Sequence, residues 1–344
     1  MSTRTRVVGL SRIIMAASAG VILNGACGGG PSSYGLDPSG GTSTGTTPST
    51  NTTTDEPNTP TGIPFNPNKP NVMLLVDRSG SMAEPADCGE ASCPSKWDQL
   101  LALGAYLEEA KQMARLGLAV FPSPDSNGCS VSPSVLVSLS EADDVDERMM
   151  AAVQAIPPGG KTPVSAALDE VRRVGGLDDP SRDNILLVMT DGQPNCACDS
   201  GDLLCEKQTA VAAVKRLVEA DPPVDVDIIG FGTSAQNAHE TLTAMAVAAG
   251  DEHYYQSDTI EELIGTLYDV ALDNIPCTFY LDEWPEPDKL VVHFDDALLE
   301  PCTTEPCTSG YTYDPTTGTV DFHGDTCDAL RDGQQHNVWF DVAE

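Results

Sequence analysis

The fold is decided by the stretch Val72-Met73-Leu74-Leu75-Val76-Asp77-Arg78-Ser79-Gly80-Ser81-Met82. Its first five residues form a continuous apolar run, which is typical of a strand buried on both faces of an α/β sheet. An acid and two hydroxyls follow at alternate positions, as Asp77, Ser79 and Ser81. Ligands of such sheets bind beyond the carboxyl ends of the strands, where these side chains are expected. Carboxylate and hydroxyl oxygens suit Mg²⁺, Mn²⁺ or Ca²⁺ rather than zinc.

Apolar runs of strand length and helical apolar stripes alternate downstream of this stretch. The alternation predicts an α/β fold with a mainly parallel central sheet and helices on both faces. Expected strands are 71–76, 115–121, 134–140, 184–190, 224–231 and 253–256, and expected helices are 97–113, 141–156, 164–174, 204–220, 237–249 and 259–272.

Two later segments have the same chemistry and the same relation to the predicted elements. Gly159-Gly160-Lys161-Thr162-Pro163 lies just before the helix 164–174, and Thr190-Asp191-Gly192 directly follows the strand 184–190. Together with Asp-x-Ser-x-Ser, and in this order, they resemble the metal-ion-dependent adhesion site (MIDAS) of the von Willebrand factor A (vWA) family. Lys161 is a departure from the family pattern.

The resemblance implies a Rossmann-like vWA domain over 70–275 and a divalent cation, Mg²⁺ first, with Mn²⁺ or Ca²⁺ as alternatives. Its metal-site residues would be Asp77, Ser79, Ser81, Thr162 and, through a water, Asp191. The cation would keep an open position for an Asp or Glu carboxylate of a partner protein. The resemblance therefore implies an adhesion-like binding module rather than an enzyme.

Two other functions remain as alternatives. The metal could merely stabilise the domain, with the protein acting as a structural or assembly subunit of an envelope complex. An enzyme in which the metal polarises a phosphate or carbonyl is less consistent with the sequence. All five histidines lie away from the three loops in sequence, so no catalytic base is apparent and no catalytic residue is assigned.

The amino-terminal part has the anatomy of an exported, tethered protein. Residues 1–27 combine early arginines with a short apolar core, as in a signal peptide. The ending Leu23-Asn24-Gly25-Ala26-Cys27 resembles the bacterial lipoprotein box, with Cys27 lipidated, although ordinary cleavage after Ala26 is an alternative. Residues 28–69 are rich in Gly, Ser, Thr and Pro, and predict a disordered linker. We expect a lipid anchor to the bacterial envelope, with outer-membrane sorting or surface exposure.

The cysteines predict disulfides in an oxidising compartment. Setting Cys27 aside, the eleven cysteines leave ten, an even number. Zinc binding at Cys196-Ala-Cys198 is the alternative, but no fourth ligand stands at a familiar spacing. The disulfide candidates are Cys88, Cys93, Cys129, Cys196, Cys198, Cys205, Cys277, Cys302, Cys307 and Cys327.

Residues 276–344 break the strand–helix alternation. Short strand-like runs and four cysteines predict a β-rich appendage stapled by disulfides, which would extend the sheet or help form a ligand surface.

The whole chain carries a formal net charge of −34, which argues against nucleic acid or an anionic membrane surface as its partner.

Overall fold

The computed structural model describes most of the chain from Gly62 onward. The described residues are 62–63, 65–85, 94–126, 128–199, 201–232, 236–295, 297–304, 306–332, 334 and 336–343. The predicted signal segment 1–27 with Cys27, the linker up to residue 61, and Cys88 and Cys93 lie outside them.

A six-stranded sheet forms the centre of the larger domain. Its strand order is β4-β3-β2-β5-β6-β7, and only β4 runs antiparallel to its neighbour. The apolar run of the deciding stretch is the central strand β2, paired on both sides as predicted. The mainly parallel α/β sheet is thus confirmed. The strands are β2 (Asn71–Asp77), β3 (Arg115–Phe121), β4 (Val135–Ser140), β5 (Asn184–Thr190), β6 (Asp225–Phe231) and β7 (Tyr255–Ser257).

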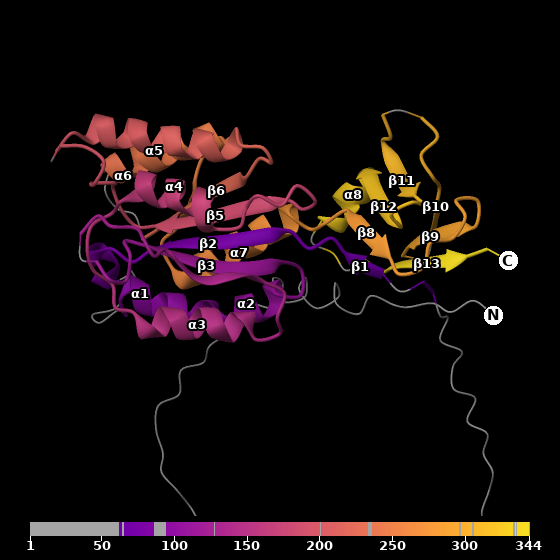
Figure 1. The fold of residues 1–344 in the computed structure, drawn as a ribbon, viewed down its shortest axis with the longest axis horizontal. Coiled ribbons are helices and arrows are strands. Elements are labelled where there is room, and N and C mark those ends of the chain that lie inside the picture. Colours follow the sequence, from indigo (N-terminus) through magenta and orange to yellow (C-terminus); the bar gives the residue numbers. More distant parts are fainter. Residues whose placement is uncertain are drawn as a thin grey trace, which may run out of the picture.

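Helices cover both faces of this sheet (Figure 1). Along β2, Leu74 and Val76 pack into one apolar cluster, while Met73 and Leu75 pack into the other. The first cluster is closed by α1 (Lys96–Gln99), α2 (Gly104–Ala110), α3 (Val145–Ala155) and α7 (Ile260–Asp273). The second is closed by α4 (Val164–Val174), α5 (Leu203–Val218) and α6 (Gln236–Ala249). Among the described residues, no helix has the length and apolar character needed to cross a bilayer.

Two helix predictions were wrong in detail. The helix expected over 97–113 is interrupted by a 3₁₀ segment, Leu100–Leu103, and ends at Ala110. Leu100 and Leu103 are both buried, and 3₁₀ geometry places residues three apart on one side. The helix expected from 141 begins at Val145, because the Ser140 hydroxyl accepts a hydrogen bond from the Ala142 N–H and holds a turn there.

The carboxy-terminal residues form a separate β-rich module, as predicted. One sheet has the order β1-β8-β12-β11 and the other β10-β9-β13, so the module does not extend the larger sheet. Phe279, Phe322 and Phe340 fill the shared core, and disulfides join Cys277 to Cys327 and Cys302 to Cys307. Its elements are β8 (Thr278–Leu281), β9 (Leu290–Phe294), β10 (Ala297–Leu299), β11 (Ser309–Asp314), β12 (Thr319–Gly324), α8 (Asp325–Leu330) and β13 (Val338–Val342).

A strand from the predicted linker completes this module. Strand β1 (Phe65–Pro67) pairs with β8, and the Ile63 N–H donates to the Phe340 carbonyl at 2.8 Å. The Phe65 ring packs edge-on against Phe340 at a centroid distance of 4.7 Å. The linker predicted over 28–69 therefore needs correction at its end, because this aromatic contact and the strand pairing order its last residues.

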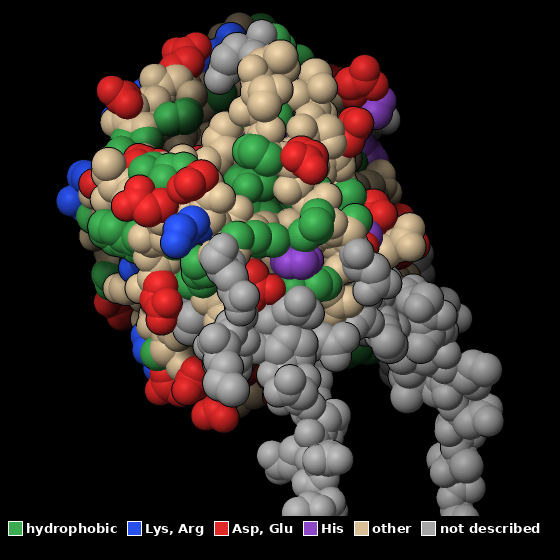
Figure 2. Space-filling model, turned by 90° about the vertical axis from the view of Figure 1, so that its right-hand side faces the viewer, with side chains coloured by type: hydrophobic (Ala, Val, Ile, Leu, Met, Phe, Trp, Pro, Cys, Tyr) green, Lys and Arg blue, Asp and Glu red, His purple; other side chains and the backbone are tan. Residues whose placement is uncertain are grey.

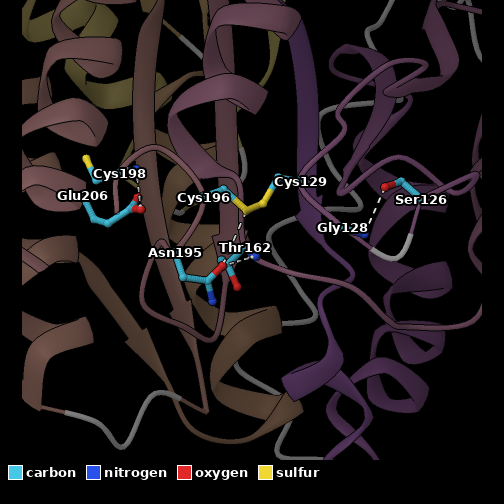
Figure 3. The surroundings of a disulfide bond; sticks show 8 residues. All are labelled: Ser126, Gly128, Cys129, Thr162, Asn195, Cys196, Cys198 and Glu206. Atoms are coloured by element: carbon cyan, nitrogen blue, oxygen red, sulfur yellow. Dashed lines mark hydrogen bonds between the residues drawn. A yellow bond between two sulfur atoms is a disulfide. The ribbon is translucent and has the colours of Figure 1, made fainter. Parts of the chain in front are cut away.

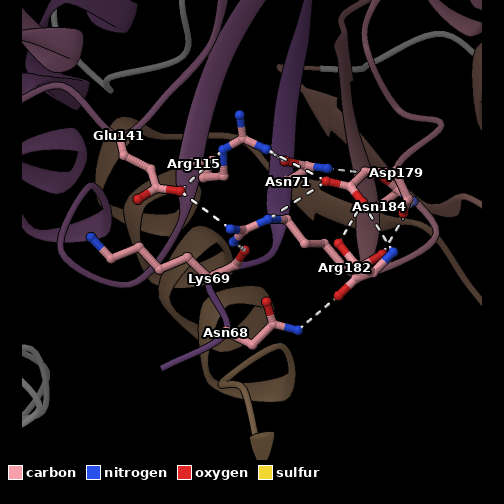
Figure 4. A network of polar contacts seen from close by, with 9 residues as sticks. Asn68, Lys69, Asn71, Arg115, Glu141, Asp179, Arg182 and Asn184 are labelled. Carbon is pink, nitrogen blue, oxygen red and sulfur yellow. Dashed lines mark hydrogen bonds and ion pairs between the residues drawn. The ribbon is translucent and has the colours of Figure 1, made fainter. Parts of the chain in front are cut away.

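The module lies at the amino ends of the parallel strands, opposite to the end where Asp77 closes β2 (Figure 1). Its outer face carries many Asp and Glu side chains and few Lys or Arg (Figure 2). A polar network fixes the amino ends of the strands (Figure 4). There the Asn71 amide donates to Asn184 at 2.9 Å, and Arg115 donates to Asn71 at 2.9 Å.

Because the β-rich module lies at the opposite end of the sheet from Asp77, it cannot contribute to a surface around Asp77.

Candidate functional site

Asp77 ends the central strand as a fully buried carboxylate. Its Oδ1 accepts from the Ser79 N–H at 2.7 Å, and its Oδ2 accepts from the Thr190 hydroxyl at 2.6 Å. Burial, followed by the charge of Asp191, raises the pKa of Asp77 to about 7, against the lowering effect of these hydrogen bonds. The charged carboxylate is thus unfavourable here unless positive charge is supplied.

The first and third predicted loops meet directly at this strand end. The Ser79 and Ser81 hydroxyl oxygens are 3.1 Å apart. The Ser81 hydroxyl donates to Asp191 Oδ1 at 2.8 Å. These contacts bring four of the five predicted site residues into one polar cluster, although Asp191 follows Ser81 by 110 positions.

The second loop is joined to both of the others. The Gly80 N–H donates to the Gly160 carbonyl at 3.1 Å, which ties it to the first loop. Thr162 is buried, and its backbone N–H donates to Asn195 Oδ1 at 2.9 Å while its carbonyl accepts from the Asn195 N–H at 3.2 Å. Asn195 thereby ties the Thr162 loop to the segment after β5.

A disulfide reinforces this junction (Figure 3). Cys129, in the connection between β3 and β4, bonds to Cys196, the residue after Asn195. The Lys161 N–H donates to the Gly128 carbonyl at 3.1 Å, so the second loop also contacts the segment beside Cys129. The connection after β3 therefore helps to hold the second loop and the segment after β5 in place.

The remaining cysteines of this region pair with each other. Cys198 bonds to Cys205, and the Glu206 carboxylate accepts from the Cys198 N–H at 2.9 Å. All eight predicted disulfide cysteines within the described residues are paired. This confirms the disulfide prediction for them and excludes the zinc alternative at Cys196 and Cys198.

Arg78 anchors the first loop through hydrogen bonds of its buried guanidinium to backbone carbonyls. Its side chain is 2% exposed and donates to the carbonyls of Pro122, Ser123, Ser126 and Pro157 at 2.8–3.3 Å. Desolvation lowers the pKa of Arg78, while the nearby Asp77 carboxylate acts in the opposite direction. This guanidinium joins the Asp-x-Ser-x-Ser loop to the connection after β3 and to the start of the second loop.

Lys96, the first residue of α1, also reaches the site. Its Nζ lies 2.7 Å from Asp191 Oδ2, and its side chain is 9% exposed. Gly232, at the end of β6 with φ of 62°, leaves space for the lysine stem, because an added Cβ would lie 3.0 Å from Lys96 Cε. The ammonium is therefore held in a preformed slot next to one of the predicted metal ligands.

The donor set fits a hard divalent cation. The clustered side chains supply carboxylate and hydroxyl oxygens, which Mg²⁺, Mn²⁺ and Ca²⁺ prefer. Within the part of the chain that the structure describes, no three His, Cys, Asp or Glu side chains gather into a metal cluster, so a cation held here would need hydroxyl oxygens among its ligands.

Comparison with known proteins agrees with this architecture. A family model of the von Willebrand factor type A domain matches residues 71–269, which is more than half of the 344-residue chain. The chain belongs to the von Willebrand factor type A family. The vWA match begins at β2 and ends within α7, so it leaves the β-rich module outside the family domain.

The chain also has curated relatives. The uncharacterized proteins YwmC and YwmD of Bacillus subtilis are each 24% identical, over 199 and 196 residues, covering 56% of this chain and 80% of each relative. Among solved structures, the chain is similar to the pilus adhesin SpaC of Lactobacillus rhamnosus GG, at 14% identity and a TM-score of 0.47. That match covers 80% of this chain and 39% of SpaC. The vWF domain of the pilus tip protein Mfa5 of Porphyromonas gingivalis is 11% identical with a TM-score of 0.45, covering 60% of this chain and 95% of that one.

Sequence reasoning missed three residues of the site. Arg78 stands inside the deciding stretch, and a charged residue directly after a buried strand is a signal that it needs partners. Asn195 carries only the weak signal of a polar residue shortly after a strand. Lys96 carried none, because its contact with Asp191 depends on where α1 begins.

Proposed function

We propose that the vWA domain binds a divalent cation at the ends of β2 and β5 and uses it to hold an acidic group of a partner protein. Asp77, Ser79, Ser81 and Thr162 would hold the cation, with Asp191 acting through a water. The role is that of a non-enzymatic, adhesion-like binding module, with Mg²⁺ as the first candidate ion and Mn²⁺ or Ca²⁺ as alternatives.

The contact between Ser81 and Asp191 carries the proposal. Their 2.8 Å hydrogen bond joins the first and third loops, and the backbone hydrogen bond from Gly80 to Gly160 brings the second loop beside them. Two carboxylates and a few hydroxyls surround a divalent cation only partly, so waters and an exchangeable position would remain. A partner carboxylate is a hard oxygen ligand of the kind that such a position accepts.

The test combines cation titration with partner capture. Isothermal titration with Mg²⁺, Mn²⁺ and Ca²⁺ should show one site in the wild type and none in Asp77→Ala. Affinity capture from bacterial envelope extracts should then recover a partner in Mg²⁺ and lose it in EDTA or with Asp77→Ala. Capture that is unchanged by both treatments would contradict the proposal.

A structural role is the second candidate, and the buried, hydrogen-bonded state of the site favours it. In that case the cation would only link the three loops of an assembly subunit. EDTA would then lower the melting temperature without releasing any partner. Measuring both quantities on the same preparation separates the two functions.

We also propose that the protein is exported and tethered to the bacterial envelope through a lipid on Cys27. The four disulfides among the described residues support an oxidising compartment, since such bonds rarely persist in the cytoplasm. Metabolic labelling with a palmitate analogue should mark the wild type but not Cys27→Ala. Equal labelling of both would refute the lipid anchor.

A further inference from the structure

Lys96 occupies a position from which it can control how strongly the site takes up a cation. Each carboxylate oxygen at the site has a specific protein donor. Asp77 is served by the Ser79 N–H and Thr190, and Asp191 Oδ1 by Ser81. The fourth oxygen, Asp191 Oδ2, forms an ion pair with Lys96, whose Nζ lies 2.7 Å away.

This ion pair is built into the fold rather than formed by a mobile surface side chain. The Lys96 N–H donates to the Glu84 carbonyl at 3.0 Å, and Ser95 forms a bridge with Pro85. Gly232 leaves no Cβ in the path of the lysine stem. Asp191 is itself enclosed, with its side chain 0% exposed, so the pair is shielded from solvent.

The charges explain what the pair does. Without Lys96, the site holds two carboxylates, which a divalent cation would neutralise. With Lys96, the two carboxylates and the ammonium sum to minus one, and a bound divalent cation would bring this sum to plus one. The Arg78 guanidinium, which donates to backbone carbonyls, adds the same charge with or without Lys96. Cation uptake is therefore opposed by the ammonium, while the loaded site keeps a positive charge that attracts one acidic group.

We propose that Lys96 is an internal counter-ion that weakens divalent-cation binding at this site and leaves the loaded site positively charged for an acidic ligand. The inference rests on the proposed cation site and adds the residue that sets its affinity. Lys96 is a positioning and tuning residue, and it is not among the cation ligands.

The test compares the wild type with two charge-removing variants in the full chain. In Lys96→Met the stem remains and the charge is lost, and in Lys96→Gln a neutral amide can still donate to Asp191. Coulomb repulsion between the Lys96 charge and a divalent cation a few ångströms away gives a change of at least about tenfold in affinity even in water. Isothermal titration with Mn²⁺ and with Mg²⁺ at fixed ionic strength should therefore show at least about tenfold tighter binding in both variants.

Lys96→Arg is the matched control, because it keeps the charge and should bind Mn²⁺ within about threefold of the wild type. Circular dichroism at saturating Mn²⁺ verifies folding, and Lys96→Gln gives the comparison if Lys96→Met does not fold. The melting temperature should also rise more on adding Mn²⁺ in the neutral variants than in the wild type.

The outcomes separate the inference from the proposed function. A wild type that binds Mn²⁺, with neutral variants that bind it equally or more weakly, would overturn the role of Lys96 alone. Absence of binding in the wild type and in every variant would overturn the cation site, and this inference with it.

Discussion

Replacing Asp77 by Asn should stabilise the cation-free protein while abolishing its response to cations. The carboxylate is fully buried, and its pKa is raised from 3.8 to about 7, first by burial and then by Asp191. In the cation-free fold the ionised carboxylate, which is the form present above about pH 7, therefore costs free energy relative to the unfolded chain. An amide has the same shape and carries no charge, so it removes that penalty.

The size of the effect follows from the pKa difference. A rise of about 3 pKa units, at about 1.4 kcal/mol each, corresponds to about 4 kcal/mol at pH 8, where both folded and unfolded carboxyl groups are ionised. The hydrogen bonds can be kept, because the Asn oxygen accepts from the Ser79 N–H and the amide can donate to the Thr190 hydroxyl. At about 2–4 °C per kcal/mol for a domain of this size, the melting temperature should rise by about 10 °C.

The pH dependence has a defined sign. Between about pH 4 and 7 the folded Asp77 holds a proton that the unfolded chain has released, so the stability of the cation-free wild type falls as the pH rises through this window. Above about pH 7 the penalty is complete and the stability no longer changes through this group. Asp77→Asn should lack this contribution.

The assay is urea denaturation in EDTA at pH 5 and pH 8, repeated with Mg²⁺ in place of EDTA. Mg²⁺ should stabilise the wild type and leave Asp77→Asn unchanged. Glu283→Gln, an exposed carboxylate of the β-rich module, controls for the loss of one negative charge. Asp77→Asn that is less stable than the wild type in EDTA at pH 8 would refute the buried-charge reasoning.

Three further perturbations test the surroundings. Arg78→Met leaves several buried carbonyls without a donor and should lower the free energy of unfolding, measured by urea denaturation, by about 3 kcal/mol. Arg78→Lys should lower it less. Equal stability of the methionine variant and the wild type would contradict the bridging role of Arg78. Replacing both Cys129 and Cys196 by Ser removes a disulfide that links residues 67 positions apart, and should lower the stability by about 4 kcal/mol of loop-closure free energy. The same change should weaken Mg²⁺ binding in titrations. Removing the short disulfide of the β-rich module should leave Mg²⁺ binding unchanged. Burial lowers the pKa of His336, but hydrogen bonds to the two aspartates beside it outweigh this and raise the pKa. The stabilising contribution of His336 is therefore complete below about pH 6.5 and is lost as the pH rises through the pKa of the folded state. His336→Gln should flatten this pH dependence of stability in denaturation curves at pH 5.5 and 8.5, and an unchanged slope would count against the assignment.

The convergence of the first and third loops could be predicted because it depends on strand direction alone. Asp77 and Asp191 each follow an apolar run that had to be a buried strand, and the ends of parallel strands meet at one edge. The pairing of hydroxyls and carboxylates at that edge then followed from the motif positions. The role of the site in binding a cation remains a prediction.

The contacts of Arg78, Lys96 and β1 (Phe65–Pro67) could not be predicted, for related reasons. Arg78 binds backbone carbonyls, which every residue possesses, so no sequence pattern marks its partners. Lys96 reaches Asp191 only because Gly232, far along the chain, leaves a slot. Strand β1 has three residues and pairs with β8, more than two hundred positions later, so its local sequence holds little strand signal.

The pairing of β1 with β8 determines at which end of the molecule a force on the preceding chain would act. The described chain enters through the β-rich module, at the pole opposite to Asp77 and Asp191 (Figure 1). A pull on the polypeptide ahead of Gly62 would therefore turn the end that holds Asp77 and Asp191 away from the point of attachment. A force between this attachment and a bound partner would act along the strands of the central sheet. It would be borne by the hydrogen bonds between β1 and β8 as well as by the loops around Asp77.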